Sequence, residues 1–390
     1  MTTERGVVRR PPGRKAQILV VASERFHRSG YHQVSMAEVA AGVGITAPAL
    51  YRHFTNKPEL LRQAVGAELA ALRTAVTAGR AGPAELCARL AAAAIDHRAL
   101  GTLWQRDARL LPAAQRAGLR RELRADVRRM AEVLGLARPE LGRADAELLC
   151  WSLLSAYGGL SYHTFAPPRR RFERLLTGLG EALLDVPFGP PGPPAPASAE
   201  LSWPAVADTR REELLAAAAR LFHQRGFDNV STDQLGAAVG IAGPSVYKHF
   251  DTKAELLAAT LVRSRERLWH EISAALAGAA TPAAALDSGL RAYLDFARRH
   301  VDYLGVTVSE TERLTEPDRK AAIDARRDLL RTWVGLLRQV RPEYDKAEAR
   351  IRVHAMFSLV NDGVRNRPGC QRADLTERLE AFARAVLGVS

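Results

Sequence analysis

The sequence predicts an all-α protein made of two similar units in one chain. Leucine and alanine are frequent, and apolar residues recur at spacings typical of a helix face, as at Leu119, Leu123 and Val127. No stretch shows the sustained apolar–polar alternation of a half-buried strand. A twelve-residue phrase also occurs twice, as VGITAPALYRHF at 43–54 and as VGIAGPSVYKHF at 239–250.

The repeat extends well beyond this phrase. Residues 18–61 pair with residues 214–257 at a constant offset of 196, with 19 identities in 44 positions and no gap. A weaker echo at offset 203 pairs LARPELGRADAE, which starts at 136, with QVRPEYDKAEAR, which starts at 339. Between the copies, residues 187–207 are rich in proline, which favours extended polyproline geometry and predicts a linker. We therefore expect two homologous units joined head to tail.

Each unit opens with the same series of helix signals. In the first unit, apolar spacing predicts a helix over residues 14–29, which Gly30 ends. The sequence SMAE from Ser35 is a capping box and predicts the start of a short second helix. Gly44 ends that helix, and Pro48 lies in the first turn of a third. The second unit repeats these signals 196 residues later.

Two short helices joined by a glycine-containing turn are typical of a helix-turn-helix motif, whose second helix lies in the major groove of DNA. A helical hairpin packed inside a core would give the same spacing. The polar run of Tyr51, Arg52 and His53 argues against the hairpin, because a core would bury these polar groups without partners. We therefore expect DNA binding.

The charge distribution agrees with a polyanionic partner. The formal net charge is +13, although an arginine-rich composition can produce a basic protein without such a partner. Residues 1–195 hold 28 basic and 17 acidic residues, and residues 196–390 hold 28 and 26. The first unit is therefore much more basic than the second.

Other classes of protein find little support. The three cysteines are scattered, and no apolar run approaches the roughly 20 residues that span a bilayer. The sequence also lacks GxSxG, HExxH, P-loop and dinucleotide-binding motifs. We expect a cytoplasmic, non-enzymatic protein with no membrane association, no catalytic residue, no metal site and no cofactor.

The segments SMAEVAAGVGITAPALYRHFTNKPELL and STDQLGAAVGIAGPSVYKHFDTKAELL resemble the DNA-binding domains of TetR/AcrR-type transcriptional repressors. The resemblance includes the Tyr-x-His-Phe ending and the following lysine in both copies. Most members of this family carry one such unit and dimerise, so a chain with two is similar to double-headed repressors of the mycobacterial mammalian-cell-entry operon type. The resemblance implies a repressor that a small apolar or lipid-like effector releases from its operator.

The resemblance also implies how the chain is divided. We expect a DNA-binding head and a helical ligand-binding and association body in each unit, with the linker between the units: 1–62, 63–186, 187–207, 208–258 and 259–390. In the family, the last two helices of each subunit build a four-helix bundle. We expect the matching helices here to pair within one chain as an intramolecular pseudo-dimer, and a homodimer with four heads stays open.

Family positions imply which residues contact double-stranded DNA. Phosphate contacts fall on hydroxyl, imidazole and ammonium groups: Ser35, Tyr51, His53, Lys57, Ser231, Tyr247, His249 and Lys253. Positions that face base edges, or that lie beside them, fall on a second set: Thr46, Ala47, Ala49, Arg52, Ala242, Gly243, Ser245 and Lys248. Arg14 belongs to a basic arm, starting at Arg9, that either enters a minor groove or is a solvated tail.

The two heads differ mainly on this reading face. Thr46, Ala47 and Arg52 of the first head correspond to Ala242, Gly243 and Lys248 of the second. Small apolar residues can contact a thymine methyl group but cannot read guanine through two hydrogen bonds. We therefore expect an operator with two unlike half-sites.

Aromatic and histidine residues on the helices of the bodies are candidates for the effector pockets, and filling the core is the alternative role for each. The candidates are His97, Trp104, Tyr157, His163, Tyr293, Phe296, His300, Tyr303 and His354. Two further alternatives concern the whole protein. It could bind DNA without sequence preference, or only its more basic first head could bind DNA.

Overall fold

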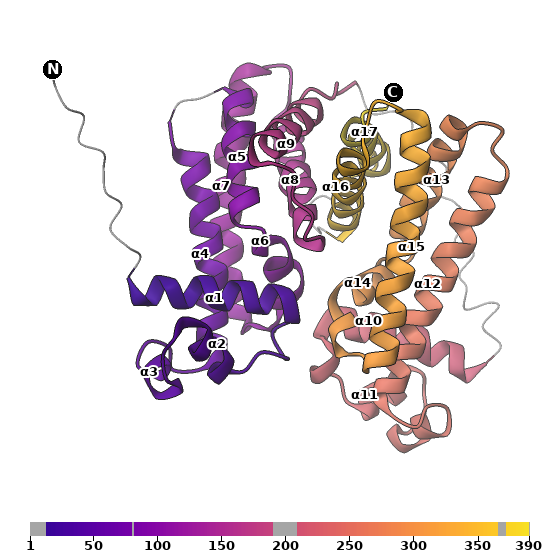
Figure 1. Ribbon diagram of the computed structural model, residues 1–390. Helices are drawn as coiled ribbons and strands as arrows, with labels where there is room; N and C mark the ends of the chain where they lie inside the picture. The colour runs from indigo at the N-terminus through magenta and orange to yellow at the C-terminus, as the bar shows by residue number, and fades with distance from the viewer. Residues whose placement is uncertain (1–12, 80–81, 190–208, 366–371, 390) are drawn as a thin grey trace.

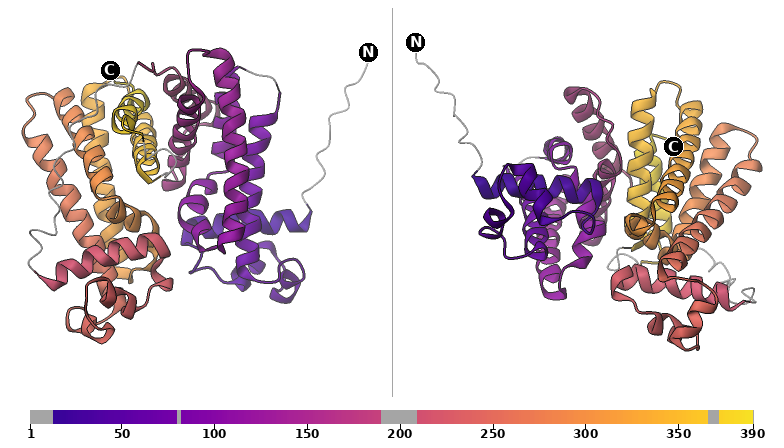
Figure 2. Two further views of the ribbon diagram at one scale, coloured as in Figure 1. Left: turned by 180° about the vertical axis from the view of Figure 1, so that it is seen from behind. Right: turned by 60° about the horizontal axis from the view of Figure 1, so that its bottom comes forward.

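The computed structural model describes residues 13–79, 82–189, 209–365 and 372–389. Within these ranges every regular element is helical, which confirms the predicted all-α class. The two units stand side by side, and both heads lie at the same end of the molecule (Figure 1). The rear view in Figure 2 shows the same arrangement, with the first unit now on the right.

The first unit contains three helices in its head and a longer series in its body. Its α-helices are α1 (Arg14–Ser29), α2 (Met36–Val43), α3 (Ala47–Tyr51), α4 (Lys57–Thr77), α5 (Pro83–Asp96), α6 (Ala99–Thr102), α7 (Ala113–Ala137), α8 (Arg143–Gly158) and α9 (Arg169–Leu184). Between α6 and α7 the chain forms the π-helical turn η1 (Leu103–Asp107) and the 3₁₀ turn η2 (Ala108–Leu110), and the 3₁₀ turn η3 (Gly159–Tyr162) follows α8.

The second unit repeats this order. Its α-helices are α10 (Arg210–Arg225), α11 (Thr232–Ala238), α12 (Lys253–Ala277), α13 (Pro282–Arg299), α14 (Val301–Glu310), α15 (Glu316–Val340), α16 (Lys346–Arg365) and α17 (Leu375–Leu387). Its 3₁₀ turns are η5 (Phe227–Asn229), η6 (Gly243–Lys248) and η7 (Thr311–Arg313).

The local signals of the heads form as predicted. Gly30 and Gly226 end the first helices with φ of 83° and 84°, which a residue with a Cβ rarely adopts. Both capping boxes are complete. The hydroxyls of Ser35 and Ser231 accept a hydrogen bond from the backbone N–H of the third helical residue, and the side chains of those residues, Glu38 and Gln234, accept one from the backbone N–H of the serine. Local chemistry therefore fixes where each helix of the motif begins.

Each head continues into its body without a break. The sequence-based boundaries at residues 62 and 258 fall inside α4 and α12, each of which runs from its head into its body. One continuous helix therefore joins each head to its body. The predicted linker at 187–207 lies almost wholly outside the described residues.

The bodies meet through α8, α9, α16 and α17, which pack together at the centre of the molecule (Figure 1). A Cβ on Gly159 would lie 2.8 Å from the carbonyl oxygen of His354, so the two backbones approach closely there. Beside it, the rings of His163 and His354 lie 4.7 Å apart. At the periphery, Arg171 donates to Asp345 at 2.6 Å.

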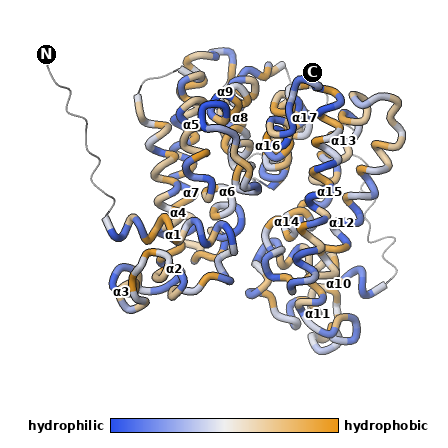
Figure 3. The backbone as a smooth tube through the Cα atoms, in the orientation of Figure 1, coloured by the Kyte–Doolittle hydropathy of each residue, from blue (hydrophilic) through white to orange (hydrophobic). Residues whose placement is uncertain are grey.

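The buried cores of the two units are not equivalent. One continuous apolar core runs from the first head through both bodies, whereas the second head has a separate core around Phe222 and Phe250. Hydrophilic and hydrophobic residues are interspersed along the labelled helices (Figure 3). None of the described helices is long and apolar enough to cross a membrane.

Candidate nucleic-acid interface and effector cavity

The third helical segment of each head carries its polar groups into solvent. Tyr51 is 51% exposed and Tyr247 is 50% exposed, which excludes the core role that a buried hairpin would require. Arg52 and Lys248, which follow them, are also exposed. These segments can therefore contact a partner without rearrangement of the head.

Most of the residues predicted to contact DNA are accessible. The exposed ones are Ser35, Thr46, Tyr51, Arg52, His53, Ser231, Ala242, Tyr247 and Lys248, and the partly exposed ones are Ala47, Ala49, Lys57, Ser245, His249 and Lys253. The hydroxyls of Ser35 and Ser231 already accept a backbone N–H in their capping boxes. Each hydroxyl keeps its O–H as a donor, and a phosphate oxygen can accept from it.

Gly243 is the exception, and the prediction that it faces base edges is wrong. It is buried, and a Cβ at this position would overlap the carboxylate and the backbone of Asp233. Its role is to let the third segment pack tightly on α11. The corresponding pair in the first head is Ala47 and Ala37, where a small residue at 37 leaves room for a methyl group at 47.

The third segment also differs in helix type between the heads. In the first head it is the α-helix α3, whereas in the second it is the 3₁₀ helix η6. Gly243 and Pro244 open η6 and the β-branched Val246 follows, a composition that favours an α-helix less than the Ala-Pro-Ala-Leu of α3. The third segments of the two heads therefore present their side chains with different spacing.

The lysines at equivalent positions of the two heads, Lys57 and Lys253, are partly engaged within the heads. The Nζ atoms of Lys57 and Lys253 lie 4.3 Å from the ring centroids of Tyr31 and Phe227 respectively. Lys253 also donates to the carbonyls of Phe227 at 2.9 Å and Val230 at 3.0 Å. An ammonium group has three donors, so one N–H of Lys253 remains for a phosphate oxygen.

Arg14 does not extend as an arm. It is the first residue of α1, and it donates to the carbonyl of Val43 at 3.4 Å, at the C-terminus of α2. Its counterpart Arg210 donates to the carbonyl of Val239 at 2.6 Å. Both arginines therefore stabilise the turn of the motif. The rest of the proposed arm, starting at Arg9, lies outside the described residues.

Sequence reasoning missed a cluster of charges that holds both heads. We call residues 103–110 the junction segment. Within it, Arg106 donates to the carbonyl of Phe26 and to both carboxylate oxygens of Asp107, at 2.9 and 3.0 Å. Arg109 donates to the carbonyl of Phe222 at 3.4 Å and pairs with Glu310. The last turn of α1 and the last turn of α10 are therefore both held by arginines of the first unit.

The two buried acids occupy equivalent places in the two units. Asp107 and Glu310 are each 2% exposed, and they are related by the offset of 203 seen in the sequence. The Tyr31 and Phe227 amides donate to these carboxylates. In the second unit, however, the position equivalent to Arg106 is Ser309. Glu310 therefore takes its counter-charge from Arg109 of the first unit.

A cavity of about 1060 Å³ lies in the first body and reaches the second unit. Three of the predicted pocket residues line it: His97, Trp104 and Tyr157. The Nδ1 atom of His97 lies 3.1 Å from Glu68, and this hydrogen bond raises the pKa of His97 above its ordinary value. Tyr157 lines the wall but has its hydroxyl committed to the Leu176 carbonyl at 2.9 Å.

His163 does not line this cavity. Its ring packs against His354 between the two bodies, and burial lowers the pKa of His163 to about 3. Burial also lowers the pKa of His354 well below the ordinary histidine value. Both rings are therefore neutral at ordinary pH, and they pack in the contact between the two bodies.

None of the remaining candidates of the second unit lines this cavity: Tyr293, Phe296 and Tyr303 are buried in the second unit, and His300 is partly exposed beside Phe296. Tyr293 packs on Trp333 and Phe357 and donates to Asn361 at 2.6 Å. The wholly buried Phe296 lies against His300, and Tyr303 lies under the guanidinium of Arg267 at 4.9 Å. Burial and the neighbouring Arg299 lower the pKa of His300 to about 4.

Comparison with protein families identifies both heads. The family model for bacterial regulatory proteins of the tetR family matches residues 18–64 and again residues 214–260. The fold and the two exposed, capped segments define a protein with two helix-turn-helix heads on helical bodies. The chain therefore carries two domains of the tetR family, one in each head.

Two curated relatives are similar over part of their length. The HTH-type transcriptional activator FasR of Mycolicibacterium smegmatis is 31% identical over 117 residues, which cover 30% of this chain and 52% of that protein. The nucleoid occlusion factor SlmA of Pasteurella multocida is 22% identical over 115 residues, covering 29% of this chain and 58% of that protein. The chain thus matches little more than half the length of these relatives.

Solved structures also resemble single units of the chain. A TetR-family transcriptional regulator from Bordetella parapertussis has a TM-score of 0.44 and 20% identity, over 47% of this chain and 96% of that one. The ketosteroid transcriptional regulator KstR2 of Mycobacterium tuberculosis has a TM-score of 0.41 and 23% identity, over 46% and 94%.

Proposed function

We propose that the protein is a sequence-specific, DNA-binding transcriptional regulator whose two heads read two unlike half-sites. The observation that carries this proposal is the pair of exposed third segments, each on a head with a complete capping box and each ending in Tyr-x-His-Phe. Helix N-termini and hydroxyl groups on such a face suit phosphate oxygens.

Unlike half-sites follow from the differences on that face. Thr46 and Arg52 of the first head correspond to Ala242 and Lys248 of the second. A guanidinium can bind guanine through two hydrogen bonds, whereas an ammonium acts as a single point charge. The change from α-helix to 3₁₀ helix also alters which side chains reach one face.

One chain per operator is the assembly that we favour. In an ordinary family member two subunits supply the four bundle helices, and here α8, α9, α16 and α17 of one chain already pack together. A homodimer with four heads is the competing assembly. Half-sites one helical turn apart, about 34–36 Å, would suit two heads that are held at a fixed distance.

We further propose repression that is relieved by a small apolar or lipid-like effector in a cytoplasmic protein. Support comes from the cavity in the first body and from the continuous helices α4 and α12, which join bodies to heads. An effector that changes the spacing of the heads would weaken simultaneous contact with both half-sites.

The test is a footprint of the purified full chain on the DNA upstream of its own gene, with the mass of the complex measured in parallel. One protected stretch with two unlike half-sites and one chain per complex supports the proposal. Two identical half-sites would contradict the proposal that the two heads read different DNA sequences. Affinity that depends on salt but not on sequence would instead indicate an architectural DNA-binding protein.

Matched variants separate the two heads. Tyr51→Ala and Tyr247→Ala remove equivalent exposed side chains, so each should weaken operator binding while leaving the fold intact. If Tyr51→Ala weakens binding and Tyr247→Ala has no effect, only the first head binds DNA. The result would then support the one-headed alternative.

A further inference from the structure

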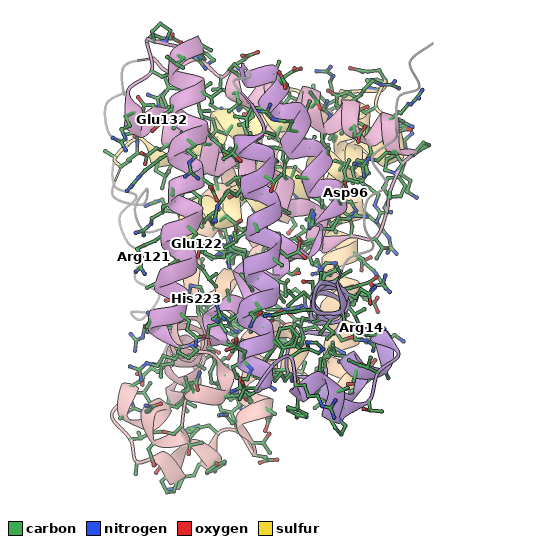
Figure 4. All side chains as sticks on the ribbon, turned by 90° about the vertical axis from the view of Figure 1, so that its left-hand side faces the viewer. Arg14, Asp96, Arg121, Glu122, Glu132 and His223 are labelled. Carbon is green, nitrogen blue, oxygen red and sulfur yellow. The ribbon has the colours of Figure 1, made fainter. Side chains whose placement is uncertain are left out.

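The cavity of the first body is shared between the two units. About half of its lining residues come from α4, α5, α7 and α8, and His223 and Gln224 at the end of α10 also line it. Figure 4 shows His223 at the lower end of the face that carries Arg121 and Glu122 of α7. A ligand in this cavity therefore touches the second head directly.

One side of the cavity is strongly basic. Arg116, Arg120 and Arg124 all line it, and their spacing of four residues places them on one face of α7. Like charges at this spacing repel one another along the helix. An anion bound beside the stripe would remove that repulsion.

The acidic groups of the same wall are already engaged. Glu68 faces His97 at 3.1 Å, and Asp362 pairs with Arg365 at 2.6 Å. Asp302 lies on the wall as well, on α14 of the second unit. Neither Glu68 nor Asp362 therefore forms an ion pair with Arg116 or Arg124.

Two further observations concern the partners of the basic groups. Arg116 donates to the backbone carbonyl of Arg109 at 3.1 Å, and Arg124 forms no ion pair with any described residue. Deeper in the wall, Arg98 is held by the carbonyls of His163 and Phe165, at 2.8 and 2.9 Å. Neutral acceptors leave its charge uncompensated, and burial lowers the pKa of Arg98 below the ordinary arginine value.

Another part of the cavity wall is apolar. Leucine side chains of α4, α5, α6 and α7 and the indole of Trp104 form this part of the wall: Leu69, Leu72, Leu90, Leu100, Trp104 and Leu123. A volume of about 1060 Å³ slightly exceeds the usual range for small-molecule sites, roughly 300–1,000 Å³. An apolar body of considerable length can therefore lie beside the basic stripe.

We propose that this cavity binds an amphipathic anion, in which a carboxylate or phosphate lies against the arginines of α7 and an extended apolar body lies against the leucines. This inference rests on the proposed function, because it names the chemical class of the effector. It requires the effector to carry negative charge, so a purely apolar molecule is not the preferred ligand.

The position of Arg109 gives the ligand access to both heads. Arg109 lines the cavity while it holds the Phe222 carbonyl and Glu310, and its neighbour Arg106 holds the Phe26 carbonyl. An anion in the cavity competes with Glu310 for the Arg109 guanidinium. Ligand binding therefore loosens the end of α10 more than the end of α1.

The first experiment measures binding by calorimetry, with the full chain and without DNA. The probes are dodecanoate, dodecyl phosphate and the neutral dodecanol. We expect the anions to bind at least about tenfold more tightly than the alcohol, because charge-assisted hydrogen bonds are the stronger ones. Comparison of dodecanoate with dodecyl phosphate shows which head group is preferred. Equal affinity for all three probes, or no binding of the anions, would overturn the proposal.

Matched variants locate the site. Arg116→Gln with Arg124→Gln removes two charges from the lining face of α7, and we expect about tenfold weaker binding of the anions with little change for dodecanol. Arg121→Gln with Arg128→Gln removes two charges from the same helix outside the cavity, and should leave binding unchanged. Equal losses in the two double variants would show attraction by net charge alone, without the proposed site.

The second experiment follows amide hydrogen exchange with and without dodecanoate. We expect faster exchange at the end of α10 and a smaller change at the end of α1. If dodecanoate binds but hydrogen exchange in α10 is unchanged, the proposed competition between the anion and Glu310 for Arg109 is contradicted. Because neither experiment contains an operator, failure here leaves the footprint result standing, and failure of the footprint leaves the ligand result standing.

Discussion

The two heads share one sequence pattern but are attached to the molecule in different ways. The core of the first head is continuous with the core of the bodies, and His27 of α1 lies 2.7 Å from the hydroxyl of Thr102 in its own body. The second head has a separate core, and His223 packs against Gly305, the residue equivalent to Thr102. The His27–Thr102 hydrogen bond of the first unit therefore has, at the equivalent place in the second unit, a close approach of the His223 ring to Gly305.

The ion pairs beside the two heads differ in the same way. The first unit keeps its own arginine for its own acid, the Arg106–Asp107 pair, whereas Glu310 in the second unit depends on Arg109 of the first. The second head is therefore complete only when the two units are together. Four predictions test this dependence, and they follow in order of expected size.

The largest effect is expected for Arg109→Ala. It leaves the buried Glu310 carboxylate without its counter-charge, and loss of one partner of a buried pair costs on the order of 3 kcal/mol. The matched variant Arg106→Ala should act on the first head instead. Hydrogen exchange should show α10 loosened by Arg109→Ala and α1 loosened by Arg106→Ala. Equal loosening of both helices in each variant would refute separate attachment.

Gly243→Ala should destabilise the second head by about 1–3 kcal/mol, because the added methyl group overlaps Asp233. Adding Asp233→Ala reproduces the arrangement of the first head, with Ala37 and Ala47, and should restore most of the loss. Urea denaturation of the single and double variants gives the coupling between the two positions. Strictly additive effects would show that the two residues do not compete for space.

The first head should weaken in acid through His27. Burial and Arg106 lower the pKa of His27 to about 4, from an ordinary value of 6.5. The unfolded chain therefore binds more protons between these values, and stability falls as pH drops from 6.5 toward 4, by up to about 1.4 kcal/mol per pH unit. In the His27→Gln variant, the free energy of unfolding should depend less on pH between 6.5 and 4. A wild-type curve that is identical to the variant curve would contradict this assignment.

The smallest effect is expected for Thr102→Val, which keeps the shape of the side chain and removes the hydroxyl beside His27. The net contribution of one such hydrogen bond is about 1 kcal/mol. Thermal unfolding with exchange mapping should place the loss at α1 and leave α10 unchanged. A loss that falls on α10 would show that the two heads are not attached independently at this level.

Local signals in the sequence predicted much of the fold. Capping boxes, positive-φ glycines and N-terminal prolines act within a few residues, so they fixed the helices of both heads and most of the exposed candidates for DNA contact. Gly243 was misjudged because its burial depends on Asp233, ten positions earlier in the chain. The 3₁₀ form of η6 was missed because helix propensity is a weak guide for so short a segment.

The sequence by itself determined the helical class, the duplication, the family and the start of each helix in the heads, because these depend on periodicity and on neighbouring residues. Tertiary structure alone decided that Arg109 completes the second head, that Tyr293 and Phe296 fill a core, and that Arg116 and Arg124 face a cavity beside His223. These arrangements join residues from distant parts of the chain, and hydrophobic burial, which is not directional, does not encode such pairings in any local pattern.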